Sequence, residues 1–107
     1  MKIIALAKYN ESAWKGMIGS SFGERRKVIE AVISSAGATL TDMMFTRGQY
    51  DIAVTFEVSS EDVALGAAIA INASGAIKDL VTLSEIDIDS ALKTAKSVAG
   101  AYTPPGS

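Results

Sequence analysis

The side chains best suited to chemistry surround one short stretch of the chain, residues 45–58. Two β-rich runs meet there across Arg47–Gly48–Gln49, and the second run begins at Tyr50–Asp51. Strand alternation places Asp51, Thr55 and Glu57 on one face of this second run, opposite an apolar face. Carboxylates and a hydroxyl on one face could hold a small ligand or move a proton.

Lys8 and Trp14 complete the set of candidates. Lys8 lies on the first predicted strand, which neighbours the third in the predicted topology, and Trp14 lies in the segment after that strand. The candidate ligand-binding residues are therefore Lys8, Trp14, Tyr50, Asp51, Thr55 and Glu57. Glu57 has two interpretations. Paired with Lys8, Thr55 or a backbone donor, it is structural. Unpaired beside an open cavity, it is a plausible base or ligand anchor, because it lies within an apolar run.

The turn residues and the tryptophan also have structural alternatives. Gly48 suits a positive φ between two strands, and Asp51 beside a turn can accept backbone N–H bonds. The functional alternative places Tyr50 or Asp51 at the mouth of a cavity. Trp14 either belongs to a lid over a pocket or is buried against the sheet edge or a partner.

The composition excludes several classes of site. The 107 residues contain no cysteine and no histidine, which removes disulfides, thiolate metal sites and the commonest general base. No phosphate loop, nucleotide fingerprint or metal-ligand cluster is present, so we expect neither metal nor cofactor. A net charge of −2 with scattered basic residues offers no face for nucleic acid. The first apolar run is short, which predicts no membrane segment and a cytoplasmic location.

Alternating strands and helices position the candidates. Runs of apolar and β-branched residues predict strands at 2–9, 38–46, 50–58 and 76–83. Capping boxes that open at Ser21, Ser59 and Ser84 predict helices, which end near Gly37, Gly75 and Val98. Residues 10–20 contain two glycines and show no sustained period, which predicts a loop with at most one helical turn.

This order predicts an α+β, ferredoxin-like βαββαβ fold with an extra C-terminal helix, in a single domain of residues 1–99 followed by a mobile tail at 100–107. Both main helices would cover one face of the sheet. On the other face Leu6, Met43 or Met44, and Leu80 need cover, and the chain is rich in apolar residues, at 49%. We therefore expect a second subunit to pack sheet against sheet.

Gly48-Gln49-Tyr50-Asp51, followed by Ile-Ala-Val, resembles the Gly-x-Tyr-Asp signature of the GYD-domain family. The similarity continues through the acidic helix start at 59–62, the alanine-rich helix and the segment from Gly75, and it covers most of residues 2–98. The resemblance implies a dimeric α/β barrel, in which two ferredoxin-like subunits enclose a cavity between their sheets. It implies a fold and an assembly and does not specify a reaction.

We interpret the sequence as a non-catalytic small-ligand-binding or assembly module that forms a homodimer or a higher homo-oligomer, with a small organic molecule as its possible ligand. The alternative is a cofactor-free enzyme that acts on a small organic molecule in the cavity between the sheets. Without histidine and cysteine, such an enzyme would rely on Glu57, Asp51, Lys8 and Tyr50.

Overall fold

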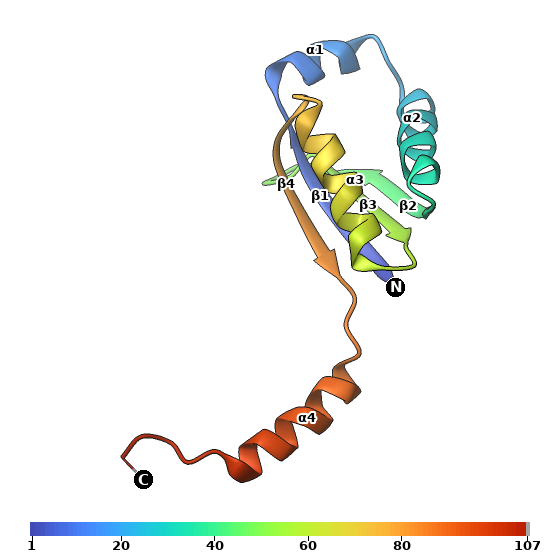
Figure 1. Cartoon of the computed structure of the whole chain (residues 1–107). Coiled ribbons are helices and arrows are strands. Elements are labelled where there is room, and N and C mark those ends of the chain that lie inside the picture. Colours follow the sequence, from blue (N-terminus) through green and yellow to red (C-terminus); the bar gives the residue numbers. More distant parts are fainter. Residues whose placement is uncertain (107) are drawn as a thin grey trace.

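The structure, a computed structural model, describes residues 1–106 and is built around one four-stranded sheet (Figure 1). In chain order the elements are β1 (Lys2–Tyr9), α1 (Glu11–Ile18), α2 (Phe22–Ser35), β2 (Thr39–Phe45), β3 (Ile52–Glu57), α3 (Glu61–Ala73), β4 (Ile77–Ser84) and α4 (Ile88–Ala101). The strand order is β2-β3-β1-β4, and each neighbouring pair is antiparallel. This topology confirms the predicted ferredoxin-like fold with an additional C-terminal helix.

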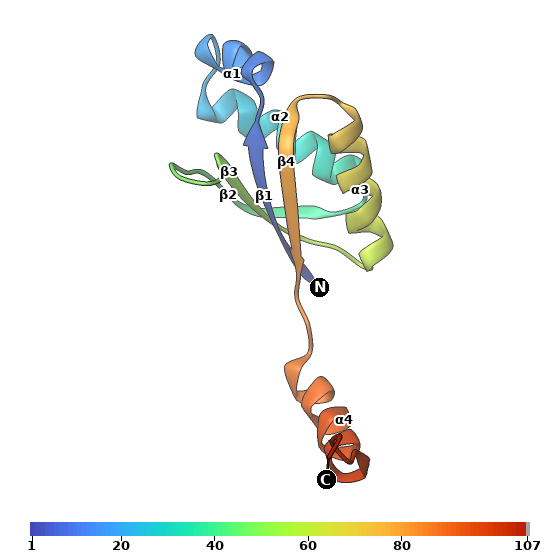
Figure 2. The same ribbon diagram turned by 90° about the vertical axis from the view of Figure 1, so that its left-hand side faces the viewer.

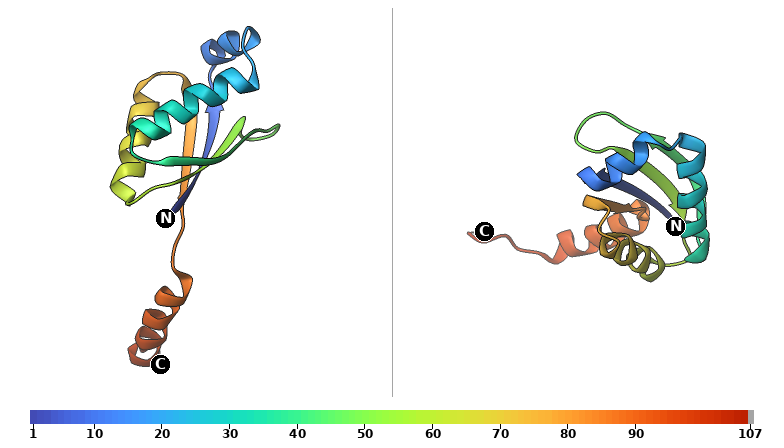
Figure 3. Two further views of the ribbon diagram at one scale, coloured as in Figure 1. Left: turned by 90° about the vertical axis from the view of Figure 1, so that its right-hand side faces the viewer. Right: turned by 90° about the horizontal axis from the view of Figure 1, so that it is seen from above.

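The molecule has two layers, because α2 and α3 cover one face of the sheet and leave the other face bare (Figures 2 and 3). α2 packs mainly on β2, and α3 packs mainly on β4. Along β3, Ile52, Val54 and Phe56 are buried beneath the helices, whereas the residues between them are half-buried on the other face. The alternation predicted for this strand is therefore confirmed.

The bare side of the sheet, which we call the open face, carries a cluster of apolar side chains. Leu6 lies between Ala53 of β3 and Val81 of β4 in the strand register, and Ile4 lies between Thr55 and Leu83. The apolar members of the open face are Ile4, Leu6, Met44, Ala53, Val81 and Leu83. Three of these large side chains are 41–51% exposed, namely Ile4, Met44 and Leu83.

Two positions that we expected to need cover lie on the helix side instead. Met43 pairs with Val54 and is buried in the core. Leu80 pairs with Ala7 and packs against the core. Leu6 and Met44 therefore remain on the open face, and the expectation for Leu80 was wrong because strand alternation turns it toward α3.

The segment predicted as a loop at residues 10–20 contains the helix α1. Asn10 is its N-cap, with the side-chain oxygen accepting the Ala13 N–H at 2.9 Å. The same side chain donates to the Gly75 carbonyl, and the Asn10 N–H donates to the carbonyl of Ala76. The single residue Asn10 thus starts α1 and connects it to the end of α3. The helix was not predicted because the segment contains two glycines.

Only the first of the three predicted helix starts has the expected cap. Ser21 Oγ accepts the Glu24 N–H at 3.2 Å, although the Glu24 carboxylate accepts the hydroxyl of Ser20 rather than reaching back to Ser21. α3 begins after Ser60, whose side chain makes no cap bond. α4 is capped by Asp87, whose carboxylate accepts the Ser90 N–H, so its predicted start at Ser84 was wrong.

α4 projects away from the sheet and the other helices (Figure 1). The Cα radius of gyration is 18.2 Å, against about 13 Å for a compact domain of this length. The apolar stripe of α4 is exposed along its whole length and consists of Ile88, Leu92, Ala95, Ala99 and, just after the helix, Tyr102. α4 continues to Ala101, and the division into a domain of residues 1–99 and a mobile tail stays a prediction.

None of the helices within residues 1–106 combines the length and the apolar character that a membrane crossing needs. The cytoplasmic location inferred from the sequence stays a prediction.

Candidate functional site

Asp51 connects the hairpin formed by β2 and β3 to the central strand β1. Its carboxylate accepts the Tyr9 N–H at 2.9 Å, and its own N–H donates to the Ala7 carbonyl at 2.9 Å. On the other side, the Asp51 carbonyl accepts the Thr46 N–H at 2.8 Å. The carboxylate satisfies a backbone donor where the register between β1 and β4 shifts, after Lys8. This geometry supports the structural interpretation of Asp51.

The turn itself is built as expected around a left-handed glycine. Gly48 has φ = 141°, and the Thr46 hydroxyl donates to the Tyr50 carbonyl at 2.7 Å across the turn. Tyr50 is half-buried and precedes the strand, which begins at Ile52 rather than at Tyr50–Asp51.

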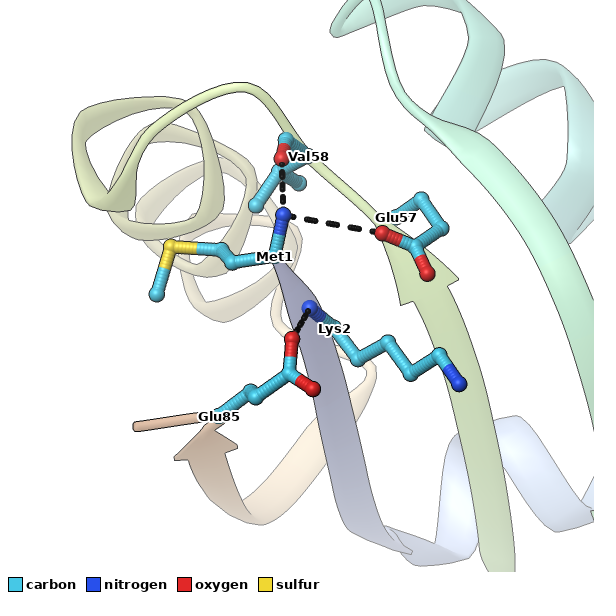
Figure 4. Close-up of polar contacts among 5 residues, drawn as sticks. All are labelled: Met1, Lys2, Glu57, Val58 and Glu85. Carbon is cyan, nitrogen blue, oxygen red and sulfur yellow. Dashed lines mark hydrogen bonds and ion pairs between the residues drawn. The ribbon is translucent and has the colours of Figure 1, made fainter. Parts of the chain in front are cut away.

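Glu57 lies at the other end of the sheet. It sits opposite Lys2 on one side and Thr39 on the other, and its carboxylate is 3.5 Å from the Met1 ammonium (Figure 4). That ammonium also donates to the Val58 carbonyl at 2.8 Å. The Glu57 side chain is 41% exposed, so it is not enclosed by apolar surroundings. Paired and solvated in this way, Glu57 has the surroundings of a surface carboxylate.

The expected grouping of Lys8 with Glu57 does not form. Glu57 is opposite Lys2, whereas Lys8 lies six residues further along β1, a separation of about 20 Å at the rise of a strand. Lys8 faces Asp79 in the register with β4, but the two form no ion pair. Thr55 is half-buried near the middle of the open face.

Trp14 belongs to a different part of the molecule. It lies on α1, and its ring meets the ring of Tyr9 edge-on at 5.7 Å between centroids. Tyr9 in turn contacts Phe45 at 6.4 Å. Trp14 thus joins an aromatic cluster at the end of β1, and the six candidates are divided among the hairpin, the far end of β3, the open face and α1.

A cavity on the helix-covered side of the sheet is lined by none of the six candidates. It measures about 380 Å³ and lies between the sheet and the helices α2 and α3. Small side chains leave this space open, among them Ala5 and Ala7 of β1 and Ala64, Ala67 and Ala68 of α3. The larger apolar side chains of Val28, Ile29 and Ile71 also line the cavity. The alanine-rich sequence of α3 is one feature of the sequence that relates to this space.

Polar groups gather at one end of this cavity. The Tyr9 hydroxyl accepts a hydrogen bond from Arg25 Nε at 3.2 Å, and the guanidinium carbon lies 5.5 Å from the centre of the Tyr9 ring. Arg25 is the only charged side chain in the lining. A second hollow begins beyond this pair, bounded by Ala13 and Met17 of α1 and by Glu24. Arg25 is not among the candidates that the sequence analysis selected, because no residue near it in sequence marks a pocket.

Comparison with known proteins adds a family match. A family model described as the GYD domain matches residues 3–95. Among solved structures, "crystal structure of FFRP-DM1" is similar at 17% sequence identity with a TM-score of 0.49, covering 79% of this chain and 97% of that chain. Comparison with curated proteins gave no match.

Proposed function

The chain belongs to the GYD-domain family, and we propose that it is a non-catalytic module that forms a homodimer by packing its open face against that of a second copy. The observation that carries this proposal is the solvent exposure of large apolar side chains on the sheet. Ile4, Met44 and Leu83 are 41%, 50% and 51% exposed on the face that no helix covers. Contiguous apolar surface of this kind marks an interaction site.

The distribution of charge on the open face supports the same pairing. Its centre is apolar, around Leu6, Ala53 and Val81, whereas Lys8 and Asp79 lie at one end of β1 and Glu57 at the other. An apolar centre with a polar rim is the usual anatomy of a protein interface. Two sheets packed face to face lie about 10 Å apart, and twofold symmetry makes the same patch complementary to itself.

α4 extends the proposed interface. The helix projects away from the body of its own chain (Figure 2), and its apolar stripe, with Leu92 near the middle, is exposed. An amphipathic helix of this length is stabilised mainly by burying its apolar face against another surface. In the proposed dimer the stripe packs against the second copy.

The separation of the acidic candidates supports a non-catalytic role. Asp51 is engaged by the Tyr9 N–H, and Glu57 is paired with the Met1 ammonium at the opposite end of the sheet. An acid–base pair needs both groups within reach of one substrate. A small organic ligand between the two sheets would contact Thr55 first, because Thr55 lies near the middle of the open face, whereas Lys8 and Glu57 lie at its two ends.

Sedimentation equilibrium of two matched variants tests this proposal. Leu6→Arg places a charge at the centre of the open face, and Leu65→Arg places the same charge on the exposed side of α3. Loss of one buried leucine removes roughly 1.5–3 kcal/mol, so Leu6→Arg is expected to raise the dimer dissociation constant at least about tenfold. Leu65→Arg should leave it unchanged. Equal effects, or a wild-type mass of 11.1 kDa at micromolar concentration, would overturn the proposal.

A further inference from the structure

We propose that the cavity beneath α2 and α3 is a binding site for a small amphipathic monocarboxylate, whose carboxylate meets Tyr9 and Arg25 while its apolar body occupies the space between sheet and helices. This site lies on the opposite side of the sheet from the open face. It therefore does not depend on the proposed dimer.

The size and lining of the cavity suit such a ligand. At about 380 Å³ it falls in the range of about 300–1,000 Å³ that is typical of small-molecule sites. The wall is apolar except for four side chains that carry polar groups, Tyr9, Arg25, Ser74 and Thr82. A mostly apolar space with a few convergent polar groups orients a ligand by its polar end.

Arg25 supplies the charge that selects an anion. Its Nε–H is used by the Tyr9 hydroxyl, which leaves the four N–H groups on its terminal nitrogens. Within residues 1–106 these four make no hydrogen bond, and Arg25 forms no ion pair. The neighbouring Glu24 bonds to Ser20 and lines the second hollow instead. One guanidinium with a free pair of terminal nitrogens matches one carboxylate.

Tyr9 provides an independent indication. Its side chain is 4% exposed and lines the cavity. The hydroxyl accepts from Arg25, yet its own proton has no acceptor among the residues that the structure describes. A buried hydroxyl donor without an acceptor is costly. A ligand carboxylate beside Arg25 would accept this proton and complete the hydrogen bonding of both side chains.

Octanoate is a suitable probe, titrated by calorimetry into the full chain alongside octanol as its uncharged counterpart. The test variants are Tyr9→Phe, which removes only the hydroxyl, and Arg25→Gln. Their matched controls are Tyr102→Phe, on an exposed ring, and Arg26→Gln, on a residue outside the cavity lining. We expect each test variant to weaken octanoate binding about tenfold, equivalent to about 1.4 kcal/mol. The controls should bind like the wild type, and octanol should bind more weakly than octanoate.

Methyl NMR of the wild-type chain locates the ligand without any substitution. Octanoate should shift the methyl signals of Ala67 and Ile71 in the cavity and leave those of Ile4 and Leu83 on the open face in place. Three results would overturn the proposal: no binding at millimolar octanoate, equal loss in test and control variants, or shifts confined to the open face.

Discussion

Removal of the Asp51 carboxylate is a sharp test of how the hairpin is attached to β1. Asp51→Ala leaves the Tyr9 N–H without its acceptor, which lies at 2.9 Å in the folded chain. Asp51→Asn keeps an oxygen at the same place but removes the charge. The two substitutions therefore separate the hydrogen bond from its charge-assisted part.

The expected loss follows from the type of bond and its surroundings. A hydrogen bond to a charged group contributes about 1.5–3 kcal/mol, and Asp51 is half-buried, so solvent screening favours the lower part of that range, about 1.5–2 kcal/mol. A domain of this size loses roughly 4–6 °C in melting temperature per kcal/mol, so Asp51→Ala should lower Tm by about 6–12 °C. Asp51→Asn should cost about half as much, because a neutral hydrogen bond remains.

Thermal unfolding followed by circular dichroism measures both losses, at one protein concentration because self-association shifts Tm. Glu30→Ala is the control, since Glu30 is exposed and makes no side-chain bond in residues 1–106. Amide exchange at Tyr9 should also become faster in Asp51→Ala. If Asp51→Ala melts like Glu30→Ala and Tyr9 exchange is unchanged, the carboxylate does not hold the hairpin and this reasoning is refuted.

Two further substitutions test the turn and the C-terminal helix. Gly48→Val should lower the free energy of unfolding by about 1–3 kcal/mol through backbone strain at its positive φ. Gly23→Val, in α2 with open space around it, should not cause this strain. Equal melting temperatures of the two variants would show that the turn does not require a positive φ at Gly48. Leu92→Glu should weaken self-association measured by sedimentation, whereas Ser97→Glu, on the opposite side of α4, should not. A dimer unaffected by Leu92→Glu would place α4 outside the interface.

The sheet could be predicted from the sequence because strand alternation is a local property. Ile52, Val54 and Phe56 show a period of two, and the structure buries all three. A positive φ at Gly48, in a turn, and at Gly37, after a helix, could likewise be predicted from local sequence, and both glycines have it. Assigning Leu80 to the wrong face shows the limit, since its side depends on pairing with Ala7, which lies far away in sequence.

Helix starts and the cavity were harder to predict for physical reasons. Asn10 and Asp87 both cap helices, yet a single Asx residue is also a common turn former. The cavity depends on alanines from β1 facing those of α3, and on a bond between Tyr9 and Arg25, 16 residues apart. No window of sequence contains that juxtaposition. The predicted candidate residues do not form one site, because their positions also depend on strand register. Lys8 and Glu57 lie on the same face of the sheet but at opposite ends of it.

The most direct test of the proposed homodimer is a set of intermolecular NOEs in a mixed sample, in which half the chains carry labelled methyl groups and half do not. Packing of the two open faces predicts NOEs between copies at the methyl groups of Ile4, Leu6, Met44 and Leu83. The exposed Leu65 and Ile69 of α3 should show none. Intermolecular NOEs at Leu65 and Ile69 with none on the open face would contradict the proposed assembly.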